Sequence, residues 1–172
     1  RGLLWVLFHV GLTISGIMLR QMEFDADSYE CRFAGSRAFA STVRKLHLLK
    51  DGEAFRTFDI ALGVEPTGHK RQEGDNRTPE GRYWLDMRND RSDYFLSIRI
   101  SYPNERDRLE ALRQGVQPGG QIMIHGQPNI PTYSAAYYRQ TDWTNGCIAV
   151  SNSDMIDIWL MTPERVPIEI LP

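Results

Sequence analysis

Apolar and polar residues alternate along much of the chain from Val43 onward, which is the pattern of strands that place one face in a core. The first alternating stretch covers residues 43–62 and is interrupted by Lys-Asp-Gly-Glu at residues 50–53. Asp-Gly between two apolar segments favours a type I′ turn, because both central residues of that turn need a positive φ. The pattern therefore predicts a β-hairpin that turns at Asp51 and Gly52.

The same alternation returns later in the chain and predicts further strands over residues 82–87, 94–102, 121–125 and 167–172. Two helices are predicted between strands: one from Asn104 to about Arg113, and one that is capped by the run 151–153 and ends before Pro163. Residues 131–140 indicate a short helix or an aromatic loop. This series predicts a mostly β, α+β fold, either a β-sandwich or a barrel-like mixed sheet with two or three short helices.

A long segment, residues 63–81, separates the hairpin from the next strand and is rich in glycine, proline and charge. Loops of this length in compact domains are often functional, although a mobile surface loop has the same composition.

The N-terminal segment differs from the rest, because residues 2–19 carry no charge and lie between Arg1 and Arg20. An uncleaved signal anchor, a cleaved signal peptide and a buried core helix all fit this pattern, and we favour the anchor. The first two alternatives agree on export and place the domain outside the cytoplasm; the family resemblance given below implies the periplasm. We therefore expect an apolar anchor or signal over residues 1–22, a polar connector over 23–42 and one folded domain over 43–172.

Composition and charge argue against several classes of function and site. A chain of 172 residues is long enough for one core, and a net charge of −2 argues against a nucleic-acid-binding face. Two cysteines are too few for a disulfide framework, and the four histidines stand too far apart in the sequence for a zinc motif.

Cys147 and His125 are the candidates for chemistry. A thiol attacks carbonyl groups as thiolate, and a nearby imidazole can accept its proton and return it to a leaving amine. Gly146 has no Cβ and so allows close approach of a substrate carbonyl, and the amides of Gly146 and Cys147 are candidates for an oxyanion hole. From spacing alone, a purely structural role of Cys147 remains an alternative, since a cysteine before Ile-Ala-Val is often a small hydrophobic residue buried in the core.

A family resemblance strengthens the chemical interpretation. His125-Gly126, a spacer and the run 144–148 (Thr-Asn-Gly-Cys-Ile) resemble the active-site signature of the YkuD-type L,D-transpeptidases, which is a histidine, a variable spacer, Ser/Thr, any residue, Gly-Cys and a hydrophobe. Residues 78–83 (Thr-Pro-Glu-Gly-Arg-Tyr) resemble the Thr-Pro-x-Gly-x-aromatic element of these domains. The resemblance covers about residues 43–172 and is closest to the exported YafK-like branch.

The resemblance implies an enzyme of cell-wall biogenesis and cell shape that needs no metal or organic cofactor. Cys147 would attack the carbonyl before the terminal D-alanine of a peptidoglycan tetrapeptide stem, with His125 as general base and then acid. An amine would resolve the thioester, either a diaminopimelate side chain of another stem or a lysine of an envelope lipoprotein. A backbone carbonyl usually orients the histidine in this family.

The resemblance also assigns supporting roles. Thr144 and Asn145 are expected to position the nucleophile, and substrate contacts are expected from Thr78, Arg82, Tyr133 and Trp143. Because a working thiol must stay reduced, Cys31 is not expected to form a disulfide with Cys147.

Two positions depart from the family pattern. Ala149 stands where Arg or Asn is common, and Asn152 or an arginine of the 71–82 loop is expected to take over that role. The spacer after His125 is long and rich in tyrosine, which indicates a reshaped lid or substrate wall.

Three alternatives to transpeptidation remain from the sequence. The first is a hydrolase that uses the same acyl-enzyme, the second a non-catalytic module that binds peptidoglycan or a protein partner, and the third an unrelated thiol protease. The intact Cys147, His125 and Gly146 argue against the second, and the order of histidine before cysteine argues against a papain-like protease.

Overall fold

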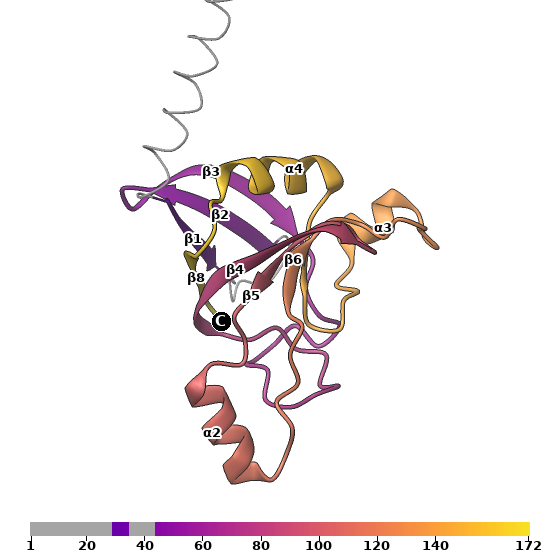
Figure 1. Ribbon diagram of the computed structural model, residues 1–172. Helices are drawn as coiled ribbons and strands as arrows, with labels where there is room; N and C mark the ends of the chain where they lie inside the picture. The colour runs from indigo at the N-terminus through magenta and orange to yellow at the C-terminus, as the bar shows by residue number, and fades with distance from the viewer. Residues whose placement is uncertain (1–28, 35–43) are drawn as a thin grey trace, which may run out of the picture.

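The computed structural model describes residues 29–34 and 44–172, and within them the chain forms a curled mixed sheet with three helices (Figure 1). The strands are β1 (Tyr29–Ala34), β2 (Arg44–Lys50), β3 (Glu53–Ile60), β4 (Gly81–Ser92), β5 (Phe95–Ile100), β6 (Met123–His125), β7 (Ile148–Ala149) and β8 (Val166–Ile170). The helices are α2 (Glu105–Gln114), α3 (Ala135–Gln140) and α4 (Asn152–Met161). This architecture confirms the mostly β, α+β prediction.

The expected N-terminal anchor, residues 1–22, lies outside the described residues. Among the helices of residues 29–34 and 44–172, none is both long and apolar enough to cross a membrane.

The eight strands follow one another in the order β3-β2-β1-β8-β4-β5-β6-β7. The pairs β1–β8 and β6–β7 are parallel, and the other neighbours are antiparallel. Directly after β3, Ala61 exchanges two backbone hydrogen bonds of 2.8 Å with Ala149 of β7. The two outer strands of the sheet are thereby joined, and the sheet closes into the predicted barrel-like form.

The predicted turns and caps are present. Asp51 and Gly52 have φ angles of 53° and 82°, as the hairpin between β2 and β3 requires. Asn104 caps α2 in a reciprocal capping box with Asp107, and Ser151 caps α4 by accepting the amide hydrogen of Asp154. The segment 131–140 contains the short helix α3.

Within the expected connector, residues 29–34 form a strand that we did not predict, β1, which lies between β2 and β8. Apolar Tyr29, Cys31 and Phe33 do alternate with polar neighbours there, but a six-residue pattern in a polar region is a weak signal. Its partner β8 comes from the other end of the chain, which a local pattern cannot reveal.

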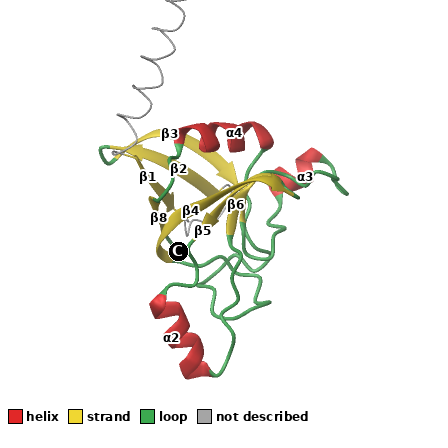
Figure 2. Cartoon of the chain, in the orientation of Figure 1, coloured by secondary structure: helices red, strands yellow, loops and turns green. Residues whose placement is uncertain are grey.

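The core lies inside the curled sheet. Alternate strand residues point inward and are almost completely buried, among them Leu85, Ile100, Ile124, Ile148 and Ile168. Helix α4 packs against β5 and adds Met155 and Ile158 to this core. Most loops gather at the end of the sheet away from α4, and α2 projects from that end (Figure 2).

Polar contacts hold α2 in place. The buried carboxylate of Asp107 accepts a hydrogen bond of 3.0 Å from the Tyr83 hydroxyl and lies 3.4 Å from Nε2 of His69. Burial raises the pKa of the Tyr83 hydroxyl above its usual range, and the charge of Asp107 adds to this effect. Tyr83 therefore stays a hydrogen-bond donor at all physiological pH values.

Gly63 should be intolerant of substitution, because a Cβ there would lie 2.0 Å from the Asn76 carbonyl oxygen and 3.1 Å from Cα of Gly146. We expect Gly63→Ala to lower the free energy of unfolding by about 1–3 kcal/mol, the usual range for overpacking. Urea unfolding would measure the loss. Gly120→Ala is the control, since its Cβ would make only an ordinary contact of 3.9 Å with Pro103. Equal stability of both variants would contradict the prediction.

Candidate active site

Cys147 and His125 line the same cavity, which has a volume of about 400 Å³. Trp143, Thr144 and Asn145 also line it, so the structure brings together five of the residues named from the sequence. A further part of the wall comes from the end of β4, the start of β5 and the turn between them.

His125 is the last residue of β6 and is only 4% exposed. Its Nδ1 lies 2.6 Å from the carbonyl oxygen of Gly126. A carbonyl can only accept, so we assign the imidazole hydrogen to Nδ1, which leaves Nε2 free to accept a proton. Gly126 therefore supplies the orienting carbonyl that side-chain reasoning could not locate.

Aromatic rings enclose the imidazole. The ring of Tyr94 lies 4.6 Å from that of His125, and Trp143 meets it edge-on at 5.6 Å. Burial lowers the pKa of His125 to about 4, and the hydrogen bond to the Gly126 carbonyl offsets only part of this effect. The imidazole is consequently neutral at pH 7, the form that a general base requires.

Cys147 lies at the end of a tight turn that the Thr144 side chain closes. The Thr144 hydroxyl donates to the Cys147 carbonyl at 2.7 Å and accepts the Gly146 amide at 3.1 Å. The backbone of Thr144 also bonds Leu62 and Val64 on the strand extension beyond β3. Thr144 thus holds the turn that carries Cys147, and its role in positioning the nucleophile stays a prediction.

Gly146 is buried and has a φ of 124°, a conformation that favours glycine. An added Cβ would lie 2.5 Å from the Arg77 carbonyl oxygen, so packing of the chain against itself already requires glycine here. The Gly146 amide is engaged by Thr144, whereas the Cys147 amide has no hydrogen-bond partner in the described part of the chain. Of the two expected oxyanion-hole donors, Cys147 is the one left free, and its role stays a prediction.

The thiol of Cys147 is half-buried and free of any disulfide. It donates a weak hydrogen bond of 3.6 Å to the carbonyl of Gln121. Burial raises the pKa of this thiol, against smaller opposing effects of the Met123 amide and the charge of Lys70. At rest, the site therefore contains a neutral thiol and a neutral imidazole rather than an ion pair.

Backbone strain is concentrated around this cavity. Three non-glycine residues near it have positive φ angles: Asn76 at 55°, Phe95 at 68° and Gln121 at 58°. Asn76 packs on Gly63, Phe95 packs on Gly126, and Gln121 contacts the thiol. Such conformations cost about 1–3 kcal/mol each and occur often at functional sites.

No residue of the tyrosine-rich spacer, residues 127–142, lines the cavity of Cys147, and a role as lid or substrate wall stays a prediction. The Tyr138 hydroxyl accepts the amides of Thr132 at 3.0 Å and Tyr133 at 3.3 Å, which folds the spacer onto itself. Nε1 of Trp143 donates to the Tyr138 carbonyl at 3.2 Å, and this bond ties the spacer to the cavity. Tyr133 stacks on Tyr137 and remains 60% exposed.

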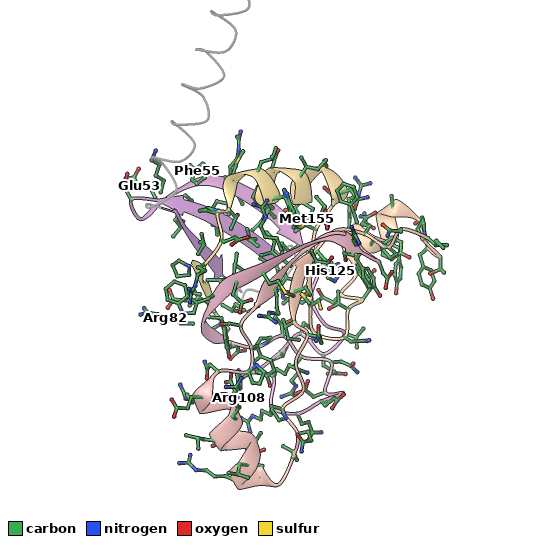
Figure 3. All side chains as sticks on the ribbon, viewed as in Figure 1. Glu53, Phe55, Arg82, Arg108, His125 and Met155 are labelled. Carbon is green, nitrogen blue, oxygen red and sulfur yellow. The ribbon has the colours of Figure 1, made fainter. Side chains whose placement is uncertain are left out.

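Three residues expected to contact substrate do not line the cavity of Cys147. Thr78 is buried, and its hydroxyl has no partner among the described residues. Arg82 bonds Glu169, and Figure 3 shows Arg82 and His125 on opposite sides of the molecule. Tyr133 is exposed and is not among the residues that line this cavity. Substrate contact by these residues stays a prediction.

Ala149 is buried at the closing seam of the sheet and borders a separate hollow of about 310 Å³. Asn152 accepts the Gln127 amide at 2.7 Å and so holds the backbone just after His125. Sequence reasoning missed Tyr94 and Asp142. The latter accepts the Leu62 amide at 2.7 Å and pairs with Arg44, which anchors the start of the Cys147 turn. Neither had a local motif that could have revealed it.

In residues 29–34 and 44–172, no group of three or more His, Cys, Asp and Glu side chains is arranged to hold a metal ion.

Comparison with known proteins identifies the family. The model of the YkuD domain, the L,D-transpeptidase catalytic domain, matches residues 36–170. The chain belongs to the YkuD family. Its members are L,D-transpeptidase-type enzymes that act on peptidoglycan peptides. No curated protein matches the chain significantly.

Solved structures share the YkuD fold of this chain. The helical cell shape determining protein Pgp2 from Campylobacter jejuni is 24% identical with a TM-score of 0.61, over 84% of this chain and 48% of that one. Bd1075 from Bdellovibrio bacteriovorus is 22% identical with a TM-score of 0.57, over 83% and 47%. An L,D-transpeptidase from Mycobacterium smegmatis is 14% identical with a TM-score of 0.50, over 84% and 59%. The YkuD chain described here thus matches about half the length of each.

The depressed pKa of His125 makes stability depend on pH. An unfolded histidine binds a proton near pH 6.5, whereas the folded one does so only near pH 4. The contribution of neutral His125 to the free energy of unfolding is therefore fully present above pH 6.5 and is lost as the pH drops toward 4. We expect a loss of about 2 kcal/mol between pH 7.5 and pH 5. Urea unfolding at each pH would measure it, and His125→Gln should remove most of the slope over that interval.

The neutral resting pair predicts how the thiol reacts. Alkylation of Cys147 by iodoacetamide should rise about tenfold per pH unit through pH 8, because only the thiolate reacts and its pKa is raised. Mass spectrometry of the labelled peptide would give the rates. A plateau that begins below pH 7 would instead indicate a preformed thiolate–imidazolium pair.

Proposed function

We propose that this YkuD protein is a cysteine-dependent L,D-transpeptidase that acts on peptidoglycan tetrapeptide stems through a thioester acyl-enzyme. Cys147 is the nucleophile and His125 is the general base and acid. The products are cross-links or protein attachments in the cell wall.

One observation carries the proposal: a free cysteine shares a cavity with a histidine whose Nδ1 is anchored on the Gly126 carbonyl. This hydrogen bond leaves Nε2 as the proton-accepting nitrogen, and burial keeps the imidazole unprotonated at pH 7. Family membership supplies the reaction class, and the cavity supplies the residues that could perform it.

The first half-reaction transfers an acyl group to the protein. As Sγ of Cys147 bonds to the carbonyl carbon before D-alanine, Nε2 of His125 accepts the thiol proton. The developing oxyanion lies within reach of the free Cys147 amide. The C–N bond then breaks, the imidazolium returns its proton to the leaving amine, and D-alanine departs.

The second half-reaction depends on the acceptor. An amine attacks the thioester, loses its proton to His125 and releases the thiol of Cys147 with a new amide bond. The acceptor is a diaminopimelate side chain of a second stem or a lysine of an envelope lipoprotein. Water as acceptor gives hydrolysis with the same residues. A substrate outside the inner membrane agrees with export through the apolar N-terminal segment, which we propose as an anchor.

Purified protein incubated with muropeptides tests the proposal. We expect mass spectrometry to show release of D-alanine and formation of new dimers linked between the third residues of two stems. A carbapenem should add covalently to Cys147, because its strained amide acylates the thiol. Lipoprotein-linked sacculi, incubated in parallel, would reveal attachment or release of the lipoprotein.

Two variants with the same chemical change separate the catalytic thiol from the other cysteine. Cys147→Ala should abolish turnover and carbapenem labelling, whereas Cys31→Ala should retain both. Activity that survives in Cys147→Ala would refute the mechanism. Clipped stems without dimers would identify water as the acceptor and make the protein a hydrolase.

A further inference from the structure

The wall of the Cys147 cavity carries two charges of opposite sign. Arg91 and Asp93 lie two positions apart, at the end of β4 and in the turn that follows, and both line the cavity. Both are exposed, and neither side chain forms a hydrogen bond or ion pair within the described part of the chain. The other described residues that line the cavity are uncharged at pH 7, since burial keeps His125 neutral and the Cys147 thiol protonated.

The turn that carries these charges has a fixed backbone. The Asn129 side chain accepts the Phe95 amide at 2.9 Å and donates to the Ser92 carbonyl at 2.8 Å. The Asn129 amide donates to the Asp93 carbonyl at 2.9 Å. Three hydrogen bonds from one asparagine thus hold the turn, and Phe95 completes it with a positive φ of 68°.

The same turn is tied to the imidazole of the reactive pair. The ring of Tyr94 lies 4.6 Å from that of His125, and Asn129 comes only four residues after His125 in the chain. The Asn89 side chain accepts the Arg91 amide at 3.0 Å, which fixes the backbone at that residue as well. Because the backbone is already ordered, less conformational entropy is lost when the two charged side chains bind a ligand.

The proposed substrate carries a matching pair of charges. When the carbonyl of the third stem residue bonds to Sγ of Cys147, the side chain of that stem residue has to lie in or beside the same cavity. A diaminopimelate side chain ends in an ammonium and a carboxylate on one carbon. Moving such charges out of water without partners is costly, whereas a neighbouring cation and anion on the protein satisfy both of them.

We propose that Arg91 and Asp93 select diaminopimelate at the third position of the donor stem. Arg91 donates to the carboxylate at the end of its side chain, and Asp93 accepts from the ammonium on the same carbon. This inference rests on the proposed function, because it takes the third stem residue as the acyl donor. A lysine at that position has the ammonium but no carboxylate, so Arg91 is the residue that distinguishes the two stems.

Binding of soluble tetrapeptides tests the selection in the full chain, with Cys147→Ala as a background that cannot form the thioester. Two peptides, identical except for diaminopimelate or lysine at the third position, are compared by titration calorimetry. We expect the diaminopimelate peptide to bind about tenfold more tightly, the scale of one charge-assisted hydrogen bond at a partly exposed site. Arg91→Gln should lower its affinity to that of the lysine peptide and leave the lysine peptide unaffected.

Asp93→Asn should weaken both peptides about threefold to tenfold, because both carry the ammonium. Asp90→Asn is the matched control for this change, since Asp90 is exposed on the same strand but does not line the cavity. Arg108→Gln is the control for Arg91→Gln, because Arg108 is exposed on α2 and lies far from His125 (Figure 3). Both controls should leave the two affinities unchanged.

Two results would overturn the selection by Arg91. An equal loss for both peptides in Arg91→Gln would place the D-alanine carboxylate, which the peptides share, at this residue. A preference that survives in Arg91→Gln, or that is already absent in the Cys147→Ala parent, would show that Arg91 does not recognise the diaminopimelate carboxylate.

Failure of this inference can be told from failure of the proposed function, because binding requires no turnover. A preference that depends on Arg91, together with absent muropeptide turnover by the wild-type chain, would refute the enzyme assignment alone. Turnover without an Arg91-dependent preference would refute the selection alone.

Discussion

The paired hydrogen bonds between Ala61 and Ala149 are the constraint on which the site depends. Strand β7 has only two residues and is too short to hold its position alone. It is fixed because one side pairs with the extension of β3 and the other with β6, where Val150 donates to the His125 carbonyl at 2.9 Å. Closing the sheet therefore places the turn of Cys147 beside the strand that ends in His125.

The seam also explains the small residue at position 149. Ala61 and Ala149 are both almost completely buried, and the side chain at 149 borders a hollow that Cys147 does not line. The position at which the family commonly has Arg or Asn thus lies at this seam and not in the wall of the cavity that holds the Cys147 thiol. Asn152 does not line the thiol's cavity either, but it supports the backbone beside His125 through Gln127.

The sequence predicted the features with local chemical causes. The Asp51-Gly52 turn, the Asn104 cap and the Cys147 motif each depend on residues within a few positions of one another. The contacts that complete the site join distant segments. Tyr94 reaches His125 from another strand pair, and Asp142 holds Leu62 across 80 residues, so neither left a local pattern. Strand β1 escaped prediction for the same reason, because one of its two partners, β8, is far from it in the sequence.

The parallel pairing of β6 with β7 has a consequence for how such domains diversify. The chain leaves the sheet after His125 and returns at Ile148, directly after Cys147, so both ends of the excursion are fixed on adjacent strands. The entropic cost of closing a loop grows only slowly with its length, so lengthening a loop whose ends are fixed lowers stability only a little. The tyrosine-rich spacer is therefore an exchangeable module: another family member's excursion could replace it while Cys147 and His125 stay in register.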